Sequence, residues 1–276
     1  MSSLPERAPG TVPTPASEAT TTSGARRWWD VLLAITQAEI REDRDLTFVG
    51  FLKWLLEPIT YMATYVLLVG VMLRRGAPDY PLFVFCAVLP WQLFQSVVPG
   101  SMGLVSGFSG VIGNRAFPRG VLPASLLLKE LTTFVLGLVL FVPLMIIFGV
   151  APTWSLLWMP VIVAVLALLC IGPAHVAAVF GVYFPDFRSV VSNLFRVGFL
   201  ASTALVRPRL VPGKNLPRIL KANPLSGIFT SFRRVVLHGQ APRRFDLIYP
   251  SVLGAVLLVI GVAVYRWRQD QFAKEL

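Results

Sequence analysis

The chain has 276 residues, of which 55% are hydrophobic and only 14% are charged. Soluble domains usually carry about 25% charged residues, so this composition argues against a soluble globular protein. The formal net charge is +11, and because the basic residues lie between apolar runs they favour contact with anionic lipid headgroups over nucleic acid.

The first 25 residues are rich in Pro, Thr, Ser and Ala and contain no apolar run of the kind found in a secretory signal. We expect them to form a disordered cytoplasmic tail. In residues 26–47, apolar side chains repeat at helical spacing and a charged segment follows them; they are Trp28, Val31, Leu32 and Ile35. This pattern predicts an amphipathic helix lying along the membrane surface, although an ordinary packed helix of a soluble subdomain would share it.

The remaining residues, 48–276, are expected to form an all-α transmembrane domain. The stretch from Leu131 to Ala174 contains no Asp, Glu, Lys or Arg. Because a helix needs about 20 apolar residues to cross the bilayer, this stretch is long enough for two spans. In all we expect six spans, at about residues 51–73, 82–105, 124–150, 156–183, 190–206 and 249–267. An even number places both termini on one side, which we expect to be the cytoplasm.

Glycines recur at spacings of three and four near the end of the second expected span, at Gly100, Gly103, Gly107, Gly110 and Gly113. On one continuous helix they would form a smooth face that lets another membrane helix approach closely. A helix that simply frays at this point is an equally good interpretation.

The segment before the last expected span has its own helix signals. Asn223 and Pro224 fit an N-cap and the first helical position, and Gly239 fits a helix stop. Between them runs an apolar stripe of Leu225, Ile228, Phe229, Phe232 and Val236. We expect an amphipathic helix that dips into the outer leaflet or re-enters the membrane, with Arg233 and Arg234 off its apolar face.

Signatures of nucleotide and metal chemistry are missing from the sequence. The one Gly-Lys pair, Gly213-Lys214, is followed by Asn215, so no phosphate-binding loop is present. The two histidines have no cluster of Cys or carboxylates around them in the sequence, and no metal site is expected. Cys86 and Cys170 lie in apolar runs and are expected to be small core residues.

Few ionisable residues lie inside the expected spans. We expect Glu57, Lys129 and Glu130 at the membrane interface and find no pair of carboxylates that indicates a proton relay. His175, in the fourth span, is expected to pack rather than to react.

Aromatic residues are abundant, at 12% of the chain. Because sugar rings stack their C–H faces on aromatic rings, such residues could line a glycan path; an interfacial aromatic belt or plain packing would use the same residues. The candidates for the path are Trp54, Tyr61, Tyr65, Trp91, Phe94 and Phe108.

Four motifs in order resemble ABC-2 type permeases that export polysaccharides. Residues 51–58 (FLKWLLEP) resemble the opening of their first span and residues 89–94 (LPWQLF) their second. Residues 112–123 (IGNRAFPRGVLP) are similar to their cytoplasmic loop, and residues 223–233 (NPLSGIFTSFR) to the segment before their last span. The match runs from about Arg26 to the C-terminus.

The resemblance implies the permease subunit of an exporter that moves a polyprenyl-pyrophosphate-linked polysaccharide of O-antigen, teichoic acid, capsule or galactan type across the inner membrane. It implies a homodimer paired with two copies of a separate ATPase subunit, which holds the ATP and Mg²⁺, while this chain binds no cofactor. It also implies cytoplasmic termini and outer re-entrant helices, to which Asn223, Pro224, Phe229, Phe232 and Arg233 would belong.

The loops that would receive force from the ATPase follow from the same resemblance. They contain Asn114, Arg115, Phe117, Pro118, Arg119, Pro123, Asp186 and Arg188. The chain departs from the family pattern after the fourth span, where Phe184-Pro185-Asp186 keeps only the acid, and at Ala204–Pro208. The alternatives are an ABC-2 exporter of a drug or lipid, a membrane glycosyltransferase, which would need clustered Asp, His or Lys, and a passive scaffold or channel subunit.

Overall fold

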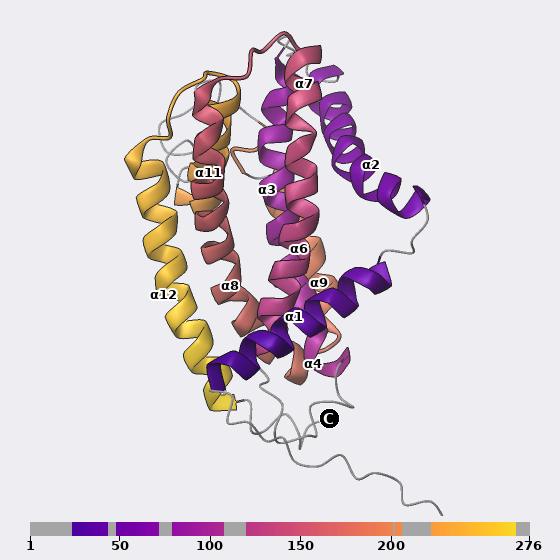
Figure 1. The fold of residues 1–276 in the computed structure, drawn as a ribbon, viewed down its shortest axis with the longest axis vertical. Helices are drawn as coiled ribbons and strands as arrows, with labels where there is room; N and C mark the ends of the chain where they lie inside the picture. Colours follow the sequence, from indigo (N-terminus) through magenta and orange to yellow (C-terminus); the bar gives the residue numbers. More distant parts are fainter. Residues whose placement is uncertain are drawn as a thin grey trace, which may run out of the picture.

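The computed structural model of the chain describes residues 24–43, 48–71, 79–107, 120–200, 202–205 and 222–268. Within these ranges the regular structure is entirely helical, as expected for an all-α protein (Figure 1). The expected disordered tail lies outside the described residues, apart from Gly24 and Ala25, which begin the first helix.

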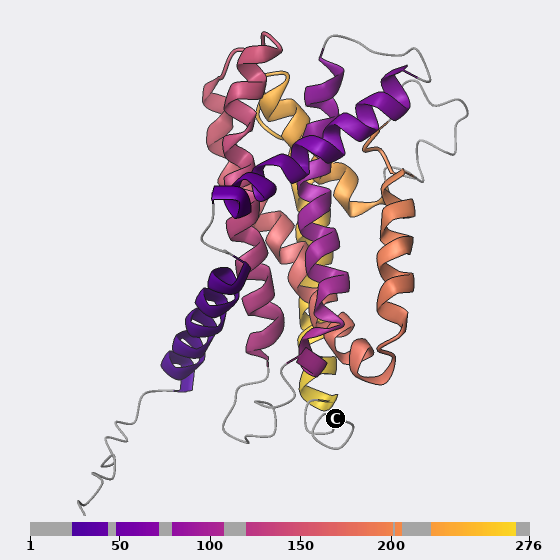
Figure 2. The same ribbon diagram turned by 90° about the vertical axis from the view of Figure 1, so that its right-hand side faces the viewer.

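The helices form an upright bundle that two oblique helices cross (Figures 1 and 2). The oblique helices are α1 (Gly24–Asp43) and α2 (Phe48–Tyr65), and the π-helix η1 (Val66–Val71) continues α2. The longer upright elements are α3 (Tyr80–Ser101), α6 (Val121–Val139) with α7 (Phe141–Ile147), α8 (Met159–Tyr183) and α12 (Arg244–Arg268). The remaining described elements are shorter: α4 (Leu104–Gly107), the 3-10 helix η2 (Trp154–Trp158), α9 (Phe187–Leu200) and α11 (Pro224–Val236).

Four helices in the described part of the chain are long and apolar enough to cross a membrane. They cover Tyr80–Ser101, Val121–Ile147, Trp154–Tyr183 and Arg244–Arg268. These correspond to the second, third, fourth and sixth expected spans, with boundaries within a few residues of those expected. The first and fifth expected spans correspond to α2 with η1 and to α9, which are not among the four, so the six-span arrangement stays a prediction.

Helix α3 is the centre of the bundle. Of its apolar stretch 72% is buried inside the protein, compared with 17% for that of α12. It packs against α2, α6, α8, α9 and α11. A helix that is hydrophobic all round is stable only when it is surrounded by protein or lipid, and α3 is surrounded by protein. Cys86 and Cys170 are buried free thiols in this core, as predicted.

Helices α8 and α12 make the most extensive helix pair of the bundle, and glycines allow it. A Cβ atom at Gly172 of α8 would overlap the backbone of Leu257, and one at Gly261 of α12 would overlap the carbonyl oxygen of Gly172. Small residues of this kind let membrane helices approach backbone to backbone. The outer face of α12 is apolar and exposed, with Val259 at 71% exposure, as lipid contact requires.

Helix α1 matches the expected amphipathic helix, with residues 26–43 of the predicted 26–47 in helical form. Its apolar stripe packs against α6 rather than facing outward, since Leu32 is only 3% exposed. Trp29 and Leu33 are exposed instead. A position of α1 along the membrane surface stays a prediction.

Helix α11 begins and ends as the sequence predicts. The Asn223 side chain accepts a hydrogen bond from the backbone N–H of Leu225 at 3.0 Å, and Gly239 has a φ of 59° just beyond the helix. The predicted apolar stripe is buried, with Phe229 and Phe232 fully covered. It packs on α3, α8 and α12; whether α11 also re-enters the membrane stays a prediction.

The prediction that Arg233 lies off the apolar face of α11 is wrong. Arg233 is 6% exposed, and its guanidinium carbon lies 3.5 Å from the ring centroid of Phe83. Its Nη1 donates to the carbonyl oxygen of Thr203 at 2.9 Å and its Nε to that of Phe83 at 3.2 Å. A buried arginine is tolerated here because backbone carbonyls and an aromatic face replace water. Arg234, by contrast, is half-buried.

The repeated glycines mark a break rather than a continuous smooth face within the described residues. Helix α3 ends at Ser101, a turn occupies residues 102–103, and α4 contains only Leu104–Gly107. A Cβ at Gly181 of α8 would overlap the Met102 carbonyl at this turn. The end of α8 therefore sits directly on the break. Gly110 and Gly113 lie outside the described residues.

Candidate functional site

Six aromatic rings from α2, α3 and α9 form a connected group, here called the ring cluster. Tyr65 of α2 lies 4.7 Å from Phe199 of α9, centroid to centroid, and Phe199 lies 5.2 Å from Trp91 of α3. Tyr61 stacks on Tyr65 at 6.5 Å. Phe94 and Phe195 stack at 5.4 Å, and each lies 6.3 Å from Trp91. The cluster thus joins three helices through their rings; its members are Tyr61, Tyr65, Trp91, Phe94, Phe195 and Phe199.

Four of the six residues predicted as glycan-path candidates belong to this cluster: Tyr61, Tyr65, Trp91 and Phe94. The other two cannot be placed, since Phe108 and the side chain of Trp54 lie outside the described part of the structure. The sequence reasoning missed Phe195 and Phe199. Their spacing of four residues matches that of Tyr61 and Tyr65, and this is the signal that could have found them.

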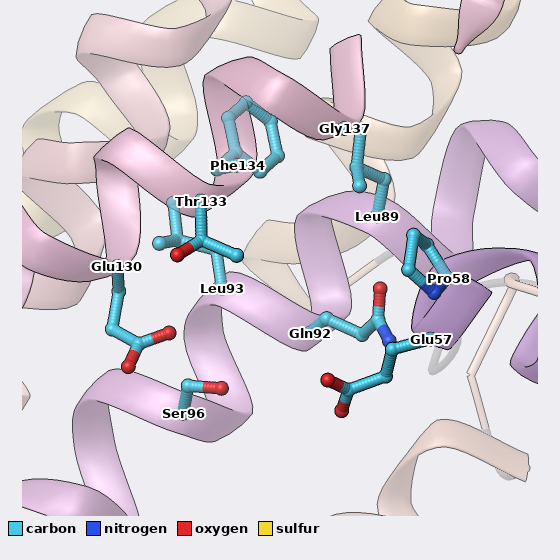
Figure 3. Close-up of a pocket in the computed structure, with 10 residues that line it drawn as sticks. All are labelled: Glu57, Pro58, Leu89, Gln92, Leu93, Ser96, Glu130, Thr133, Phe134 and Gly137. Atoms are coloured by element: carbon cyan, nitrogen blue, oxygen red, sulfur yellow. The ribbon is translucent and has the colours of Figure 1, made fainter. Parts of the chain in front are cut away.

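A pocket opens between α2, α3 and α6 (Figure 3). Its floor is buried and apolar, whereas polar side chains stand around it. The floor consists of Pro58, Leu89, Leu93, Phe134 and Gly137, and the polar side chains are those of Glu57, Gln92, Ser96, Glu130 and Thr133. The cavity volume is about 60 Å³, which is far below the several hundred Å³ of a whole-ligand site.

The two glutamates of this pocket come from different helices. In Figure 3 the carboxylates of Glu57 and Glu130 and the hydroxyl of Ser96 point toward one space. Glu130 is the tenth residue of α6, so it lies about 14 Å along the helix from the Val121 end at 1.5 Å per residue. The sequence reasoning placed both glutamates at the interface and did not pair them, because nothing in the sequence indicates that they face each other.

Three of the residues predicted to couple the chain to an ATPase, Pro123, Asp186 and Arg188, lie at one end of the bundle, where α4, the start of α6 and the turn between α8 and α9 are found (Figures 1 and 2). Pro123 is buried in the first turn of α6, while Asp186 and Arg188 are exposed at the start of α9. A Cβ at Gly103 would lie 2.5 Å from Nη1 of Arg188, so this guanidinium lies against the break after α3. Asn114, Arg115, Phe117, Pro118 and Arg119 lie outside the described residues.

Three exposed phenylalanines, here called the phenylalanine triad, lie beside Asp186. Phe184 is 4.8 Å from Phe180 and 5.8 Å from Phe187, centroid to centroid. Their exposures are 39%, 48% and 49% for Phe180, Phe184 and Phe187. Sequence reasoning missed them, although the spacing of four and three residues is a visible signal.

Reactive groups elsewhere in the described residues do not assemble into a metal site, because no three His, Cys, Asp or Glu side chains gather there. His175 packs edge-on against Tyr265 at 5.4 Å, and its Nδ1 lies 2.8 Å from the carbonyl oxygen of Ile171. Its surroundings are therefore those of a packing residue, as predicted.

Comparison with known proteins finds relatives over most of the chain. The O-antigen export system permease protein RfbA of Myxococcus xanthus is 29% identical over 251 residues, which cover 89% of this chain and 95% of the relative. The protein of the same name from Klebsiella pneumoniae is 24% identical, with 90% and 95% covered. The polysialic acid transport protein KpsM of Escherichia coli is 25% identical, with 86% and 93% covered. No family model matches the chain.

Proposed function

We propose that the chain is the membrane-spanning subunit of an ATP-driven polysaccharide exporter of the ABC-2 type, because over nearly its whole length it is similar to an O-antigen export permease and a polysialic acid transport protein. The observation that carries the proposal is the coincidence of this relationship with a ring cluster between α2, α3 and α9. Rings that can stack on successive sugars suit a polymer, which must be held weakly at many points as it moves.

The finer parts of the proposal concern the assembly. The chain would act as a homodimer with two copies of a separate ATPase subunit, in the inner membrane, with six spans and both termini in the cytoplasm. The substrate would be a polysaccharide joined to a polyprenyl pyrophosphate, whose lipid stays in the bilayer while the sugars cross. ATP and Mg²⁺ would be bound by the partner subunit.

The packing at the α8–α9 turn supports a route for force from the ATPase. Arg188 lies against Gly103, and Gly181 sits on Met102, so a displacement of the turn would press on the break at the end of α3. Because α3 contributes Trp91 and Phe94 to the ring cluster, the same displacement would reach the rings. The exposed phenylalanine triad and Asp186 would form the surface that the ATPase pushes.

Export of a drug or lipid by an ABC-2 exporter is the alternative function. A drug or lipid exporter would not need aromatic rings spaced along a path, so the two functions differ in the effect that loss of one ring should have on polymer export.

Substituting Tyr61 with alanine is expected to lower polysaccharide export about 2- to 10-fold, because one ring contact contributes about 0.5–1.5 kcal/mol. Tyr61 suits this test since it is half-buried and at the edge of the cluster. Tyr61→Phe should retain export, as the ring remains. The measurement is the amount of glycan at the cell surface per unit of permease in the membrane. Trp154→Ala, at a ring with 87% exposure in η2, is the matched control; equal loss in both variants would contradict the path.

Depletion of the chain from its own cells tests the function as a whole. We expect one lipid-linked glycan to accumulate on the cytoplasmic side, and re-expression of the chain to clear it. The chain should also co-purify with an ATPase whose hydrolysis depends on it. If no lipid-linked glycan accumulates and surface glycans are unchanged, the export function is wrong.

A further inference from the structure

We propose that a polar stripe on helix α9 lines the export path, and that Arg196 within this stripe binds a phosphate group of the substrate. This inference rests on the proposed export function and adds to it a binding site. Residues three and four positions apart lie on one side of a helix, and four polar residues of α9 are spaced in this way: Ser189, Ser192, Asn193 and Arg196. All four are exposed or half-buried.

The rest of the α9 surface is apolar and has two different surroundings. One side carries Phe195 and Phe199, which pack on Trp91 of α3. The other side is exposed, and its residues are Val190, Leu194 and Val197. An exposed apolar side suits contact with lipid, whereas a polar stripe with an arginine is costly there and is expected to face water. We therefore place the polar stripe toward a water-filled path and the apolar side toward lipid.

Arg196 lies at the level of the middle of α3. Its chain neighbour Phe195 is 6.3 Å from Trp91, centroid to centroid, and Trp91 is the twelfth of the 22 residues of α3. Figure 2 shows α9, in orange, upright beside this helix, which is long and apolar enough to cross a membrane. The headgroups of bilayer lipids lie at the two membrane surfaces. At this depth the substrate, rather than a bilayer lipid, brings an anionic group to Arg196.

The side chains of the stripe suit a phosphate. The guanidinium of Arg196 offers five N–H donors in a planar fork, which pairs with two phosphate oxygens at once. Ser192 and Asn193 precede it by about one turn on the same side of the helix, so a hydroxyl and an amide can donate to the same group. The sequence of α9 contains no Asp or Glu, so its own side chains include no anion that competes for the guanidinium. A glycan on a pyrophosphate carries the complementary charge.

The ring cluster lies next to this site. Tyr65 of α2 is close enough for the charge of Arg196 to act on its hydroxyl, and its ring lies 4.7 Å from that of Phe199. Phe199 follows Arg196 by three residues, which is about one turn of α9. A sugar that stacks on these rings would therefore bring its attached phosphate within reach of the guanidinium.

Thiol labelling tests which side of α9 faces water. The natural cysteines, Cys86 and Cys170, are both buried, so an introduced cysteine can be labelled selectively. In the purified full chain in lipid nanodiscs, we expect Asn193→Cys to react at least about tenfold faster than Leu194→Cys with a negatively charged, membrane-impermeant thiosulfonate, because the reaction needs an accessible thiolate. Equal rates, or a faster reaction at Leu194→Cys, would contradict a water-filled path along the stripe.

A binding experiment tests Arg196 itself. The probes are farnesyl pyrophosphate and farnesol with the same fluorescent label, and the nanodiscs contain phosphatidylcholine. We expect the unchanged chain to bind the pyrophosphate probe at least about tenfold more tightly, because charge-assisted bonds to arginine are strong. Arg196→Gln should remove this preference and Arg196→Lys should keep part of it. Arg243→Gln, at an exposed arginine just before α12, is the matched control and should keep the preference.

Four results would overturn the phosphate site. The first is equal binding of both probes by the unchanged chain, and the second is an equal loss of preference in Arg243→Gln. The third is loss of the preference when the nanodiscs contain phosphatidylglycerol, which would assign Arg196 to a lipid headgroup. The fourth is normal export by depleted cells that carry Arg196→Gln; the export function would then stand without this site. Failure of the unchanged chain to restore export in those cells would instead remove the export function.

Discussion

Replacing Gly172 with valine is expected to separate α8 from α12 and to destabilise the fold by about 3 kcal/mol or more, at the upper end of what overpacking costs. The reason is that a Cβ at this position would overlap the backbone of Leu257. A side chain can often turn away from an added atom, but the backbone of a packed helix cannot. The two helices would therefore have to move apart along their whole contact.

The measurement is the midpoint of thermal unfolding of the purified chain in detergent, together with its elution as a monodisperse species. The matched control is Ala255→Val, on the exposed face of α12, which adds the same kind of side chain toward lipid and should change the midpoint little. Gly261→Val should resemble Gly172→Val, because its Cβ would overlap the carbonyl oxygen of Gly172. A Gly172→Val protein as stable as the Ala255→Val protein would show that the two helices do not pack in this way.

Replacing Arg233 with alanine is the second change expected to have a large effect, at least about 3 kcal/mol. Three backbone carbonyls, those of Phe83, Thr203 and Ala204, accept hydrogen bonds from its guanidinium. Leaving a buried polar group without its partner costs about 1–3 kcal/mol for each group. Loss of the guanidinium also removes the contact with the ring of Phe83.

Arg233→Lys should recover part of this stability, because an ammonium keeps the charge but cannot reach three carbonyls with the geometry of the planar guanidinium. The neighbouring Arg234 offers a matched control. It is half-buried, and its Nε donates to the carbonyl oxygen of Ala241 at 3.0 Å, so Arg234→Ala should cost no more than about 1 kcal/mol. Thermal unfolding would separate the two; equal midpoints for Arg233→Ala and Arg234→Ala would contradict the buried role.

Arg233 also matters for the ring cluster. The residues that it holds, Thr203 and Ala204, follow closely on the end of α9, and the Tyr80 hydroxyl donates to the carbonyl of Leu205 at 3.1 Å. Phe199 near that end contacts both Tyr65 and Trp91. We therefore expect Arg233→Ala to loosen α9 and to lower polysaccharide export more than its effect on the amount of protein explains.

The local signals in the sequence predicted local structure well. Asn223 and Gly239 mark the beginning and the region just beyond the end of α11, and the long apolar runs became the four long apolar helices. Caps and apolar runs depend on residues within a few positions of each other, so a single sequence contains all the information they need.

The faces of these helices could not be predicted in the same way. In a water-soluble protein the apolar side of a helix faces the core, but in a membrane protein lipid and protein are both apolar partners. Helix α3 and helix α12 are therefore both rich in apolar residues, although α3 is buried by other helices and α12 is largely exposed. For the same reason the burial of Arg233 could not be predicted, because it depends on backbone carbonyls of α3 and of residues 203–204.

The sequence by itself determined that this chain is an all-helical membrane protein and where its long helices lie. It also identified four of the six aromatic residues of the ring cluster as candidates. Only the tertiary structure decided that Phe195 and Phe199 complete the ring cluster and that Glu57 and Glu130 line one pocket. The physical reason is that these contacts join residues far apart in the chain, and their existence depends on how α2, α3, α6 and α9 pack rather than on any spacing within one helix.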